Sequence, residues 1–502
     1  MSVVIAIDAG TTGVRSRAIF TDGRASVSSY LEFPQYFPQP GWVEHDALEI
    51  LFAVCQTLSD VIAQLAKLPD AKIVAIGVTN QRETIVAWDK STGVPFGRAI
   101  VWQDRRTAER CTELLPMLAT VRAITGLVLD PYFSGSKVQW MIRSGQAPRS
   151  ANLAVGTIDS WIIWNLTGGN SFVTDPSNAS RTMLFDINNM HWSEQMCDTF
   201  DVPLYSLPNV VPSSGRCGVT KRISNTDNNA DINIPGGIPI SGIAGDQQAA
   251  LFGQACFDVG SSKNTYGTGS FVLMNVGTEC PPPTDGMLTT VAWDLGSGKP
   301  TYALEGSIFV TGSAIQWLRD GLNIIDNAAQ VGPLAASVTD SGGVVVVPAF
   351  TGLGSPWWDP YARGIICGIT RGTTRAHIAR AVVQSMTFQT RDVVEAMVRA
   401  TGVPLIDMRV DGGAAVMDMM LQMQADQLGV TVVRPKDLET TALGAAYLAG
   451  LAEGVFPTLR SITESWQLDR TFTPEPSPTT DSEYSQWSRA VQRSLNWAQD
   501  SH

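Results

Sequence analysis

A plan of strand, Gly/Thr-rich turn and strand occurs twice in the chain, and this repetition constrains the fold more than any other feature. The apolar residues 3–7 lead into DAGTTG at 8–13, and residues 263–266 lead into GTGS at 267–270, after which residues 271–275 resume a β pattern. Each pattern predicts a β-hairpin. Since the copies open two halves of similar length, they favour two domains with related cores and a cleft between them, although chance recurrence of Gly and Thr in hairpins explains them equally well.

Mixed strand and helix signals follow each hairpin. Residues 73–79 and 344–347 are continuous apolar runs typical of buried strands, and residues 378–397 carry apolar side chains at helical spacing. The alternation predicts α/β layers, and a chain of 502 residues is too long for one core. Residues 227–239 are rich in Asn, Gly and Pro and predict a surface loop.

The C-terminal segment has a composition of its own. Residues 472–481 are rich in Pro, Ser and Thr, which predicts a linker. Beyond it, Tyr484, Trp487, Val491 and Leu495 fall on one face of a helix. We expect residues 471–502 to form a Pro-rich linker and a terminal helix that docks on the body.

Charge and cysteine usage exclude several classes of protein. The formal net charge is −12, and an acidic surface repels nucleic acid and anionic lipid heads. The seven cysteines are scattered singly, which indicates a reducing compartment. The N-terminus lacks the features of a signal peptide, and we expect no later apolar run to approach the roughly 20 residues of a membrane helix. These features predict a cytoplasmic protein that neither binds nucleic acid nor inserts into a membrane.

Common catalytic motifs are missing from the sequence. Its four histidines show no metal-ligand spacing, and it contains no P-loop, no G-x-G-x-x-G and no G-x-S-x-G. We therefore expect catalysis to rest on carboxylates, arginine, backbone amides and a bound ion.

Two glycine-rich segments are candidates for phosphate binding. In DAGTTG, Asp8 can orient a hydrated Mg²⁺ while the backbone N–H groups cradle phosphate and Arg15 neutralises charge. Gly412 and Gly413 stand between a predicted strand and helix, where close backbone approach and a helix N-terminus favour an anion. An ordinary tight turn remains the alternative at each place. Gly444, by contrast, indicates close helix packing.

Polar residues at predicted strand ends are candidates for binding a small polar ligand and for catalysis. Arg82 and Glu83 follow the strand 73–79 and can hold vicinal hydroxyls, although a solvated Arg-Glu pair on the surface is the alternative. Asp246 follows an apolar run and is placed for catalysis or for capping the next helix. Trp102 and Tyr132 can cover the carbon edge of a ligand or belong to the core.

Seven longer runs carry a resemblance to a known family. They are GWVEHD at 41–46, TNQRET at 79–84, DPYFSG at 130–135, NASRTM at 178–183, SGIAGDQQ at 241–248, NTYGTG at 264–269 and TTALGAAY at 440–447. Together they resemble the FGGY carbohydrate kinases of the actin/hexokinase-like superfamily, and within them the branch that phosphorylates glycerol. The similarity runs from residue 4 to about residue 497.

The resemblance implies an α/β fold with two actin-like (ribonuclease H-like) ATPase domains flanking a deep catalytic cleft. Residues 1–252 would form the glycerol-binding domain and residues 253–470 the nucleotide-binding domain. The implied activity is ATP-dependent phosphorylation of glycerol to sn-glycerol 3-phosphate, with ATP and Mg²⁺ as cofactors. Relatives of this kind also imply a homodimer or homotetramer.

The resemblance assigns roles residue by residue. Asp246 would be the general base. The glycerol site would comprise Arg82, Glu83, Trp102, Tyr132, Asp246, Gln247 and Phe271. The nucleotide site would comprise Thr11, Thr12, Gly13, Arg15, Thr268, Gly269, Gly312, Gln316, Gly412, Gly413 and Met417, with Asp8 at the metal.

One departure from the family pattern concerns the nucleotide. Met417 replaces the Asn that usually meets adenine, with Asp418 beside it, which predicts looser nucleotide selectivity. Two other functions stay open: a kinase for another small polyol or ketose, and a non-catalytic, nucleotide-dependent sensor of the same fold.

Overall fold

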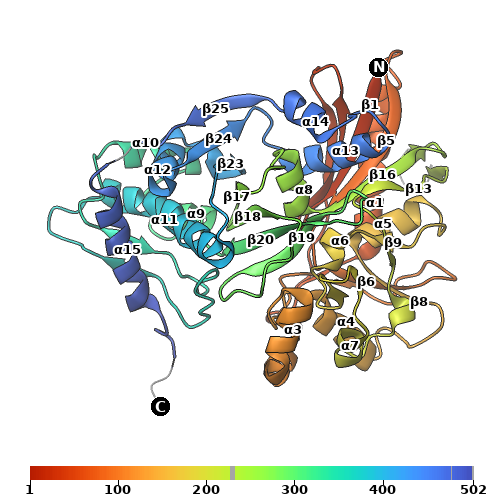
Figure 1. The fold of residues 1–502 in the computed structure, drawn as a ribbon, viewed down its shortest axis with the longest axis horizontal. Coiled ribbons are helices and arrows are strands. Elements are labelled where there is room, and N and C mark those ends of the chain that lie inside the picture. Colours follow the sequence, from red (N-terminus) through yellow and green to blue (C-terminus); the bar gives the residue numbers. More distant parts are fainter. Residues whose placement is uncertain (226–231, 476, 500–502) are drawn as a thin grey trace.

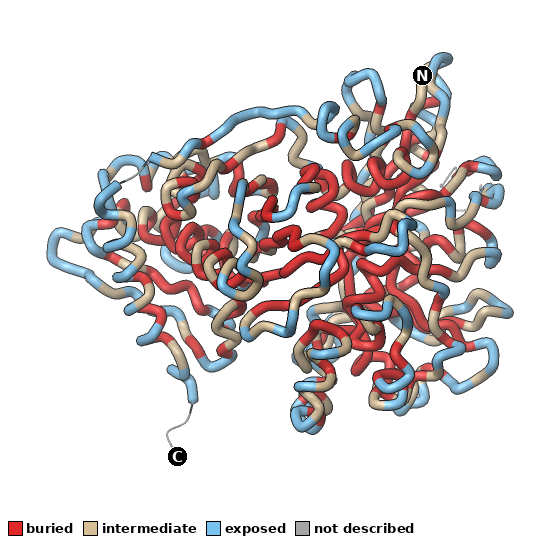
Figure 2. The backbone as a smooth tube through the Cα atoms, in the orientation of Figure 1, coloured by how far each residue is buried: buried red, intermediate tan, exposed pale blue. Residues whose placement is uncertain are grey.

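The chain folds into two α/β domains, each built around one large sheet (Figure 1). The structure is a computed structural model that describes residues 1–225, 232–475 and 477–499. Buried backbone is concentrated in the two sheets and the helices against them, whereas the outer loops are exposed (Figure 2).

The first domain contains a six-stranded sheet in the order β13-β16-β5-β1-β2-β3. Its strands are β1 (Ser2–Ala9), β2 (Gly13–Phe20), β3 (Val27–Glu32), β5 (Lys72–Asn80), β13 (Ser214–Val219) and β16 (Pro239–Gly245). β5 runs parallel to β1 and β16, whereas β2 runs antiparallel to both of its neighbours, β1 and β3. The carboxyl ends of β1, β5 and β16 therefore meet at one edge of the sheet.

The second domain contains a seven-stranded sheet in the order β19-β20-β18-β17-β23-β24-β25. Its strands are β17 (Ser261–Tyr266), β18 (Ser270–Gly277), β19 (Leu288–Trp293), β20 (Thr301–Ile308), β23 (Asp407–Asp411), β24 (Thr431–Pro435) and β25 (Leu468–Phe472). Strands β20-β18-β17-β23-β24 repeat the order and directions of β3-β2-β1-β5-β16. The prediction of two domains with related cores is confirmed, and chance recurrence of the hairpins is wrong.

Helices and short strands complete the two domains. The helices are α1 (Ala47–Leu65), α2 (Ala108–Glu113), α3 (Leu118–Thr125), α4 (Ser134–Arg143), α5 (Ile158–Leu166), α6 (Pro176–Ala179), α7 (Glu194–Thr199), α8 (Asp246–Gly253), α9 (Gly312–Asp320), α10 (Val331–Ala336), α11 (Arg375–Thr401), α12 (Asp418–Leu428), α13 (Thr440–Ala452), α14 (Leu459–Ser465) and α15 (Thr480–Ser494). A four-stranded sheet comprises β4 (Glu44–His45), β7 (Ala99–Ile100), β6 (Ile85–Asp89) and β8 (Leu153–Thr157). Two-stranded ladders pair β9 (Val173–Thr174) with β12 (Asn209–Val210), β10 (Phe185–Asp186) with β11 (His191–Trp192), β14 (Ile223–Asn225) with β15 (Ile232–Ile234), and β21 (Val345–Val347) with β22 (Ile365–Cys367).

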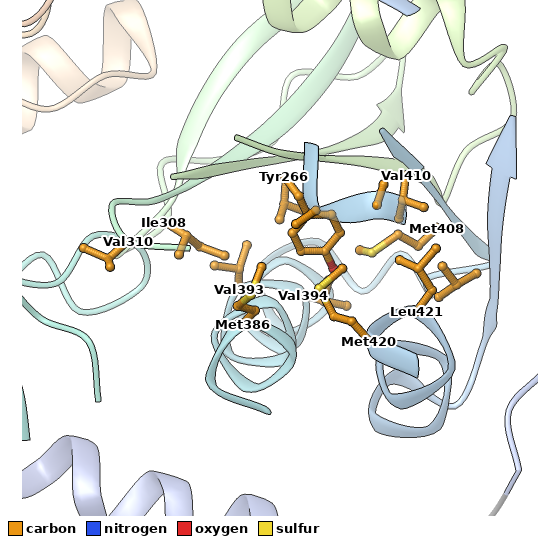
Figure 3. Packing of buried hydrophobic residues seen from close by; sticks show 14 of the residues in the cluster. Tyr266, Ile308, Val310, Met386, Val393, Val394, Met408, Val410, Met420 and Leu421 are labelled. Carbon is orange, nitrogen blue, oxygen red and sulfur yellow. The ribbon is translucent and has the colours of Figure 1, made fainter. Parts of the chain in front are cut away.

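The core of the second domain lies between its sheet and helices α11 and α12 (Figure 3). Met386 and Val393 from α11 and Met420 from α12 meet Met408 on β23 in one buried cluster. Tyr266 enters the same cluster from β17 and satisfies its hydroxyl by donating to Gln424 Oε1 at 2.7 Å. This packing fixes the end of β17, where the second Gly/Thr turn begins.

Helix α13 crosses from the second half of the chain onto the first sheet, where it packs on β1, β5 and β16 and beside α8. A Cβ atom on Gly77 would lie 2.0 Å from the carbonyl oxygen of Ala445, and one on Gly444 would lie 1.8 Å from that of Ala249. Glycine is required at both positions because a side chain would collide with backbone. The expectation that Gly444 serves helix packing is confirmed.

Two sequence expectations need correction. Among the described residues, α1 is long and apolar enough to cross a membrane, so the expectation that no run approaches that length is wrong. Half of the apolar window of α1 is buried, and the helix packs on β2 and β3, as a core helix does. Within the predicted loop 227–239, residues 227–231 lie outside the described residues, and Ile232–Ile234 form β15 because Ile232 and Ile234 enter the core.

The C-terminal helix α15 lies on the outer side of the second domain (Figure 1). Trp487 is fully buried, and its indole N–H donates to Asp392 Oδ2 on α11 at 2.8 Å. The Tyr484 hydroxyl donates to Asp392 Oδ1 at 2.6 Å. The predicted linker is shorter than expected, since Phe472 ends β25 and α15 begins at Thr480.

Candidate active site

Asp8, Arg82 and Asp246 stand at or just beyond the adjacent carboxyl ends of β1, β5 and β16. Asp246 is the first residue of α8, and Gly245 occupies the N-cap, so the capping alternative for Asp246 is wrong. Its carboxylate accepts from the N–H of Gln247 at 2.7 Å and lies 3.2 Å from Arg82 Nε. The Asp246 side chain is 29% exposed, which leaves it accessible to a ligand.

Arg82 and Glu83 are buried, with 2% and 1% of their surface exposed, so the alternative of a solvated surface pair is wrong. The Arg82 guanidinium donates to Tyr132 Oη at 3.3 Å and to Gln248 Oε1 at 3.3 Å. Glu83 adopts φ of 59°, an uncommon backbone conformation for a residue with a Cβ. Strain of this kind persists where the surroundings fix a side chain in place.

Sequence reasoning missed two members of this charged cluster. Glu305, fully buried on β20 of the second domain, accepts from Arg82 Nη1 at 2.5 Å and Nη2 at 3.1 Å. Arg181, fully buried just beyond α6, donates to Glu83 Oε1 at 2.7 Å and to Glu305 Oε1 at 2.9 Å. The signal for Glu305 was a carboxylate inside the apolar run 302–308, and the signal for Arg181 was its place in the run NASRTM.

Three aromatic side chains surround the charged cluster. Trp102 and Tyr132 pack edge to face with centroids 5.7 Å apart. The ring of Phe271, on β18, lies 5.9 Å from the Arg82 guanidinium carbon. The structure thus brings together the aromatic and charged residues that the sequence assigned to the glycerol site.

Burial and neighbouring charges change the acidity of the site carboxylates. Burial, then Asp246 and Glu439, raise the pKa of Asp8 to about 7, against an opposing effect of Arg15. Burial also raises the pKa of Asp246, opposed by Arg82 and Lys263. An aspartate with a raised pKa is a stronger base than an ordinary one and suits proton abstraction near neutral pH.

Lys263 is a further residue that sequence reasoning did not single out. It is fully buried on β17, and its ammonium donates to Thr265 Oγ1 at 2.9 Å and to Gln247 Oε1. Burial lowers the pKa of Lys263 to about 8, although Asp411 and Asp246 oppose the change. Lys263 therefore places positive charge beside the expected base.

The carboxylates of Asp8 and Asp246 suit a divalent cation that keeps most of its waters better than one ligated entirely by protein side chains. No cluster of three or more His, Cys, Asp or Glu side chains with metal-binding geometry occurs in the described ranges. Asp8 and Asp246 nevertheless lie close enough for Asp246 to raise the pKa of Asp8. Mg²⁺ commonly binds through one or two carboxylates and keeps several waters, so this pair fits it.

The expected nucleotide residues of the second domain gather around the β17–β18 turn. The N–H of Gly312, at the start of α9, donates to the Gly267 carbonyl at 3.0 Å, and that of Thr311 donates to Thr268 at 3.0 Å. Gly412 has φ of 86°, and a Cβ there would lie 2.5 Å from the Tyr266 carbonyl oxygen. The turn, the start of α9 and the β23–α12 junction therefore form one continuous edge. Gln316 on α9 and Gly413 are exposed there, whereas Met417 is half-buried.

In the first hairpin, residues that were expected to contact phosphate instead contact other side chains of the protein. Arg15 forms an ion pair with Glu439, just before α13, and lies over the Tyr30 ring at 5.4 Å. Thr12 Oγ1 is 3.5 Å from the Tyr30 hydroxyl. Gly13 belongs to β2, with a virtual Cβ 2.7 Å from the same hydroxyl. In this structure Arg15 therefore neutralises a carboxylate of the chain itself.

The duplicated actin-like fold, with buried charged side chains at the ends of its central strands, places the chain in the class of carbohydrate kinases. The chain matches the FGGY family of carbohydrate kinases, N-terminal domain, over residues 3–253 and the C-terminal domain over residues 262–453. It belongs to this family.

Individual relatives are similar over their whole length. The chain is 51% identical to "Glycerol kinase 2" of Thermotoga maritima and 51% identical to "Glycerol kinase" of Symbiobacterium thermophilum, with 99% of each chain covered. The structure of Plasmodium falciparum glycerol kinase with ADP matches with a TM-score of 0.92 and 35% identity, covering 99% of this chain and 98% of that one. Gluconate kinase from Lactobacillus acidophilus matches at TM-score 0.84 and 21% identity, and shares the fold.

Proposed function

We propose that this chain is a glycerol kinase, which transfers the γ-phosphoryl group of ATP to glycerol and releases sn-glycerol 3-phosphate and ADP in glycerol catabolism. The observation that carries the proposal is the grouping of Arg82, Glu83 and Asp246 beside three aromatic rings. The relatives at 51% identity, which bear the name glycerol kinase, support the choice of substrate.

The substrate site offers both kinds of hydrogen-bonding partner that a triol needs. In the described part of the chain, Glu83 accepts its side-chain hydrogen bond at Oε1, which leaves Oε2 for a substrate hydroxyl. Arg82 Nε lies 3.2 Å from the partly exposed carboxylate of Asp246, and Gln247 follows directly in sequence. A substrate that lacked one hydroxyl would leave a buried polar group unpaired, at a cost of about 1–3 kcal/mol. Trp102, Tyr132 and Phe271 would cover the carbon edge of the molecule.

Asp246 would act as general base. Its carboxylate takes the proton of the terminal glycerol hydroxyl while that oxygen attacks the γ-phosphorus. The bond between the γ-phosphorus and the β–γ bridging oxygen breaks, and ADP leaves with the electron pair. Tyr132 and Arg82 would hold the reacting hydroxyl in line, and closure of the two domains would exclude water.

The nucleotide would lie along the edge formed by the β17–β18 turn, α9 and the β23–α12 junction. The family implies ATP, and the residues assigned to it are Thr11, Thr12, Gly13, Arg15, Thr268, Gly269, Gly312, Gln316, Gly412, Gly413 and Met417. Asp8 would hold Mg²⁺ through water, and the ion supplies charge neutralisation to the phosphates. For Arg15 to reach phosphate, it must exchange its partner Glu439.

The proposal also covers the roles of the two domains, the cellular location and the oligomeric state. We assign glycerol to residues 1–252 and the nucleotide mainly to residues 253–470, with both substrates in the catalytic cleft that this fold implies. All seven cysteines fall in the described ranges and are free thiols, which suits the cytoplasm. A homodimer or homotetramer is the expected assembly.

Release of ADP from Mg-ATP, measured with glycerol, dihydroxyacetone, erythritol and xylulose, tests the proposal. We expect glycerol to give the highest kcat/KM. A higher value with erythritol or xylulose would favour the alternative of a kinase for another polyol or ketose. Binding of nucleotide without ADP release on any of the four would favour the non-catalytic sensor.

A further inference from the structure

Glu305 is a carboxylate of the second domain inserted into the arginine cluster of the first. It lies on β20, opposite Leu273 of β18 and Leu288 of β19. A Cβ atom on the next residue, Gly306, would lie 2.3 Å from Val393 of α11. Since successive side chains of a strand point to opposite faces, Glu305 projects away from α11 and toward the first domain.

The contacts of Glu305 fix the plane of the Arg82 guanidinium. Its two oxygens accept from Nη1 at 2.5 Å and from Nη2 at 3.1 Å, a two-point geometry that allows one orientation of the fork. In that orientation, Nε lies 3.2 Å from Asp246 and Nη2 lies 3.3 Å from the Tyr132 hydroxyl. Glu305 Oε1 also accepts from Arg181, which in turn holds Glu83.

Charge keeps this arrangement in place. Burial would raise the pKa of Glu305, but Arg181 and Arg82 outweigh it and lower the pKa to about 2, so the carboxylate stays ionised at every working pH. Without it, two buried guanidinium groups would share the carboxylates of Glu83 and Asp246. Arg82 would then be drawn toward Asp246, the expected base.

We propose that Glu305 is a positioning residue of the glycerol site: from the second domain, it orients Arg82 directly and Glu83 through Arg181, so that the site for the alcohol is complete only when β20 is docked. The inference rests on the proposed function, because it assigns Arg82 and Glu83 to glycerol. It adds a residue from the domain to which we assign the nucleotide.

The substitution E305Q tests the proposal with little change in shape. A glutamine has one acceptor oxygen where the three recorded hydrogen bonds need two, and its NH₂ group would face an arginine N–H. We expect the Kd and KM for glycerol to rise about ten- to hundredfold, as for loss of a hydrogen bond to a charged group, while the KM for Mg-ATP stays unchanged. E305D keeps the charge on a shorter stem, and we expect an intermediate Kd.

The matched control is D159N. Asp159, in α5, is also a fully buried carboxylate, and it accepts from Thr157 at 2.5 Å and Thr174 at 2.6 Å, neither of which belongs to the predicted glycerol site. D159N should bind glycerol as the wild type does. If E305Q and D159N raise the Kd equally, or if E305Q binds glycerol normally, Glu305 does not position the site and the proposal is overturned.

Two further results distinguish failure of the proposed function from failure of the role assigned to Glu305. A wild-type enzyme that neither binds nor phosphorylates glycerol overturns the proposed function, whatever the variants do. Should E305Q fail to fold, hydrogen exchange of the wild type decides: glycerol should slow amide exchange in β20, and unchanged exchange there would overturn the role of Glu305.

Discussion

The indole N–H of Trp102 donates to the hydroxyl of Thr11 at 3.0 Å, and this bond joins an expected glycerol residue to an expected phosphate residue. The ring of Trp102 packs on Tyr132 at the same time. Through Trp102, the turn after β1 is linked to the side chains that we propose bind glycerol.

W102F should therefore affect both substrates. Phenylalanine keeps a ring against Tyr132 but cannot donate to Thr11, and loss of one neutral hydrogen bond is worth about 0.5–1.5 kcal/mol. We expect the KM values for glycerol and for Mg-ATP each to rise several-fold in steady-state kinetics. W161F, which loses the indole donor to the Ala47 carbonyl in the core of the first domain, is the control and should leave both KM values unchanged. A rise confined to glycerol would show that the Thr11 bond has no bearing on the nucleotide.

Asp8 should make both stability and catalysis depend on pH. Its pKa is about 7 in the folded protein and 3.8 ordinarily, so the folded state binds the proton more tightly. The stabilising contribution of protonated Asp8 is thus complete below about pH 4 and is lost as pH rises toward 7. Since Mg²⁺ needs the ionised carboxylate, kcat/KM for Mg-ATP should rise with pH up to about 7.

Melting curves and kinetics between pH 4.5 and 8.5 check both trends. D8N should be nearly inactive, and its stability should depend less on pH than that of the wild type. A wild-type kcat/KM that is flat between pH 5.5 and 7.5 would contradict the assignment of Asp8 to the metal.

Met417 should relax the choice of nucleotide. Its thioether cannot replace the hydrogen bonds of the Asn that is usual in the family, and Asp418 beside it is held by Arg434 at 2.8 Å. We expect GTP to support turnover at a substantial fraction of the rate with ATP, and M417N to shift the ratio of kcat/KM values toward ATP. Strong rejection of GTP by the wild type, unchanged in M417N, would refute this prediction.

The contact between α13 and α8 should not accommodate any side chain at position 444. In G444A the new methyl group would start 1.8 Å from the carbonyl oxygen of Ala249, so the helices must separate. We expect a loss of about 3 kcal/mol, at the upper end of overpacking costs, seen as a lower melting temperature. G413A is the control, because a Cβ there meets nothing within 4 Å, and it should melt like the wild type.

Local sequence patterns were sufficient to predict several strands and helices of the fold. The two hairpins, the buried strands and the long helix α11 follow from apolar runs and helical spacing. The position of α13 on the first sheet could not be predicted in this way, because it depends on Gly77 and Gly444, which allow close contact with the distant residues Ala445 and Ala249. Strand β15 was missed because polar composition around it outweighed its two buried isoleucines.

Likewise, some residues of the candidate site could be identified from local sequence and others could not. Arg82, Glu83 and Asp246 were found because strand ends are where α/β proteins place polar side chains. Glu305, Arg181 and Lys263 were missed. The role of a charged residue inside a strand or just beyond a short helix cannot be inferred from local sequence, because it depends on a partner elsewhere in the chain. The partner of Glu305 lies 223 positions away in sequence and in the other domain.

The most direct test of the central claim is glycerol-dependent ADP release by D246N, measured beside glycerol binding by calorimetry. The amide keeps the shape of the side chain but cannot accept the proton of the attacking hydroxyl. We expect turnover to fall by at least about a hundredfold, as for loss of a general base, while glycerol still binds with a similar Kd. Turnover at the wild-type rate would contradict the role of Asp246 and the mechanism built on it.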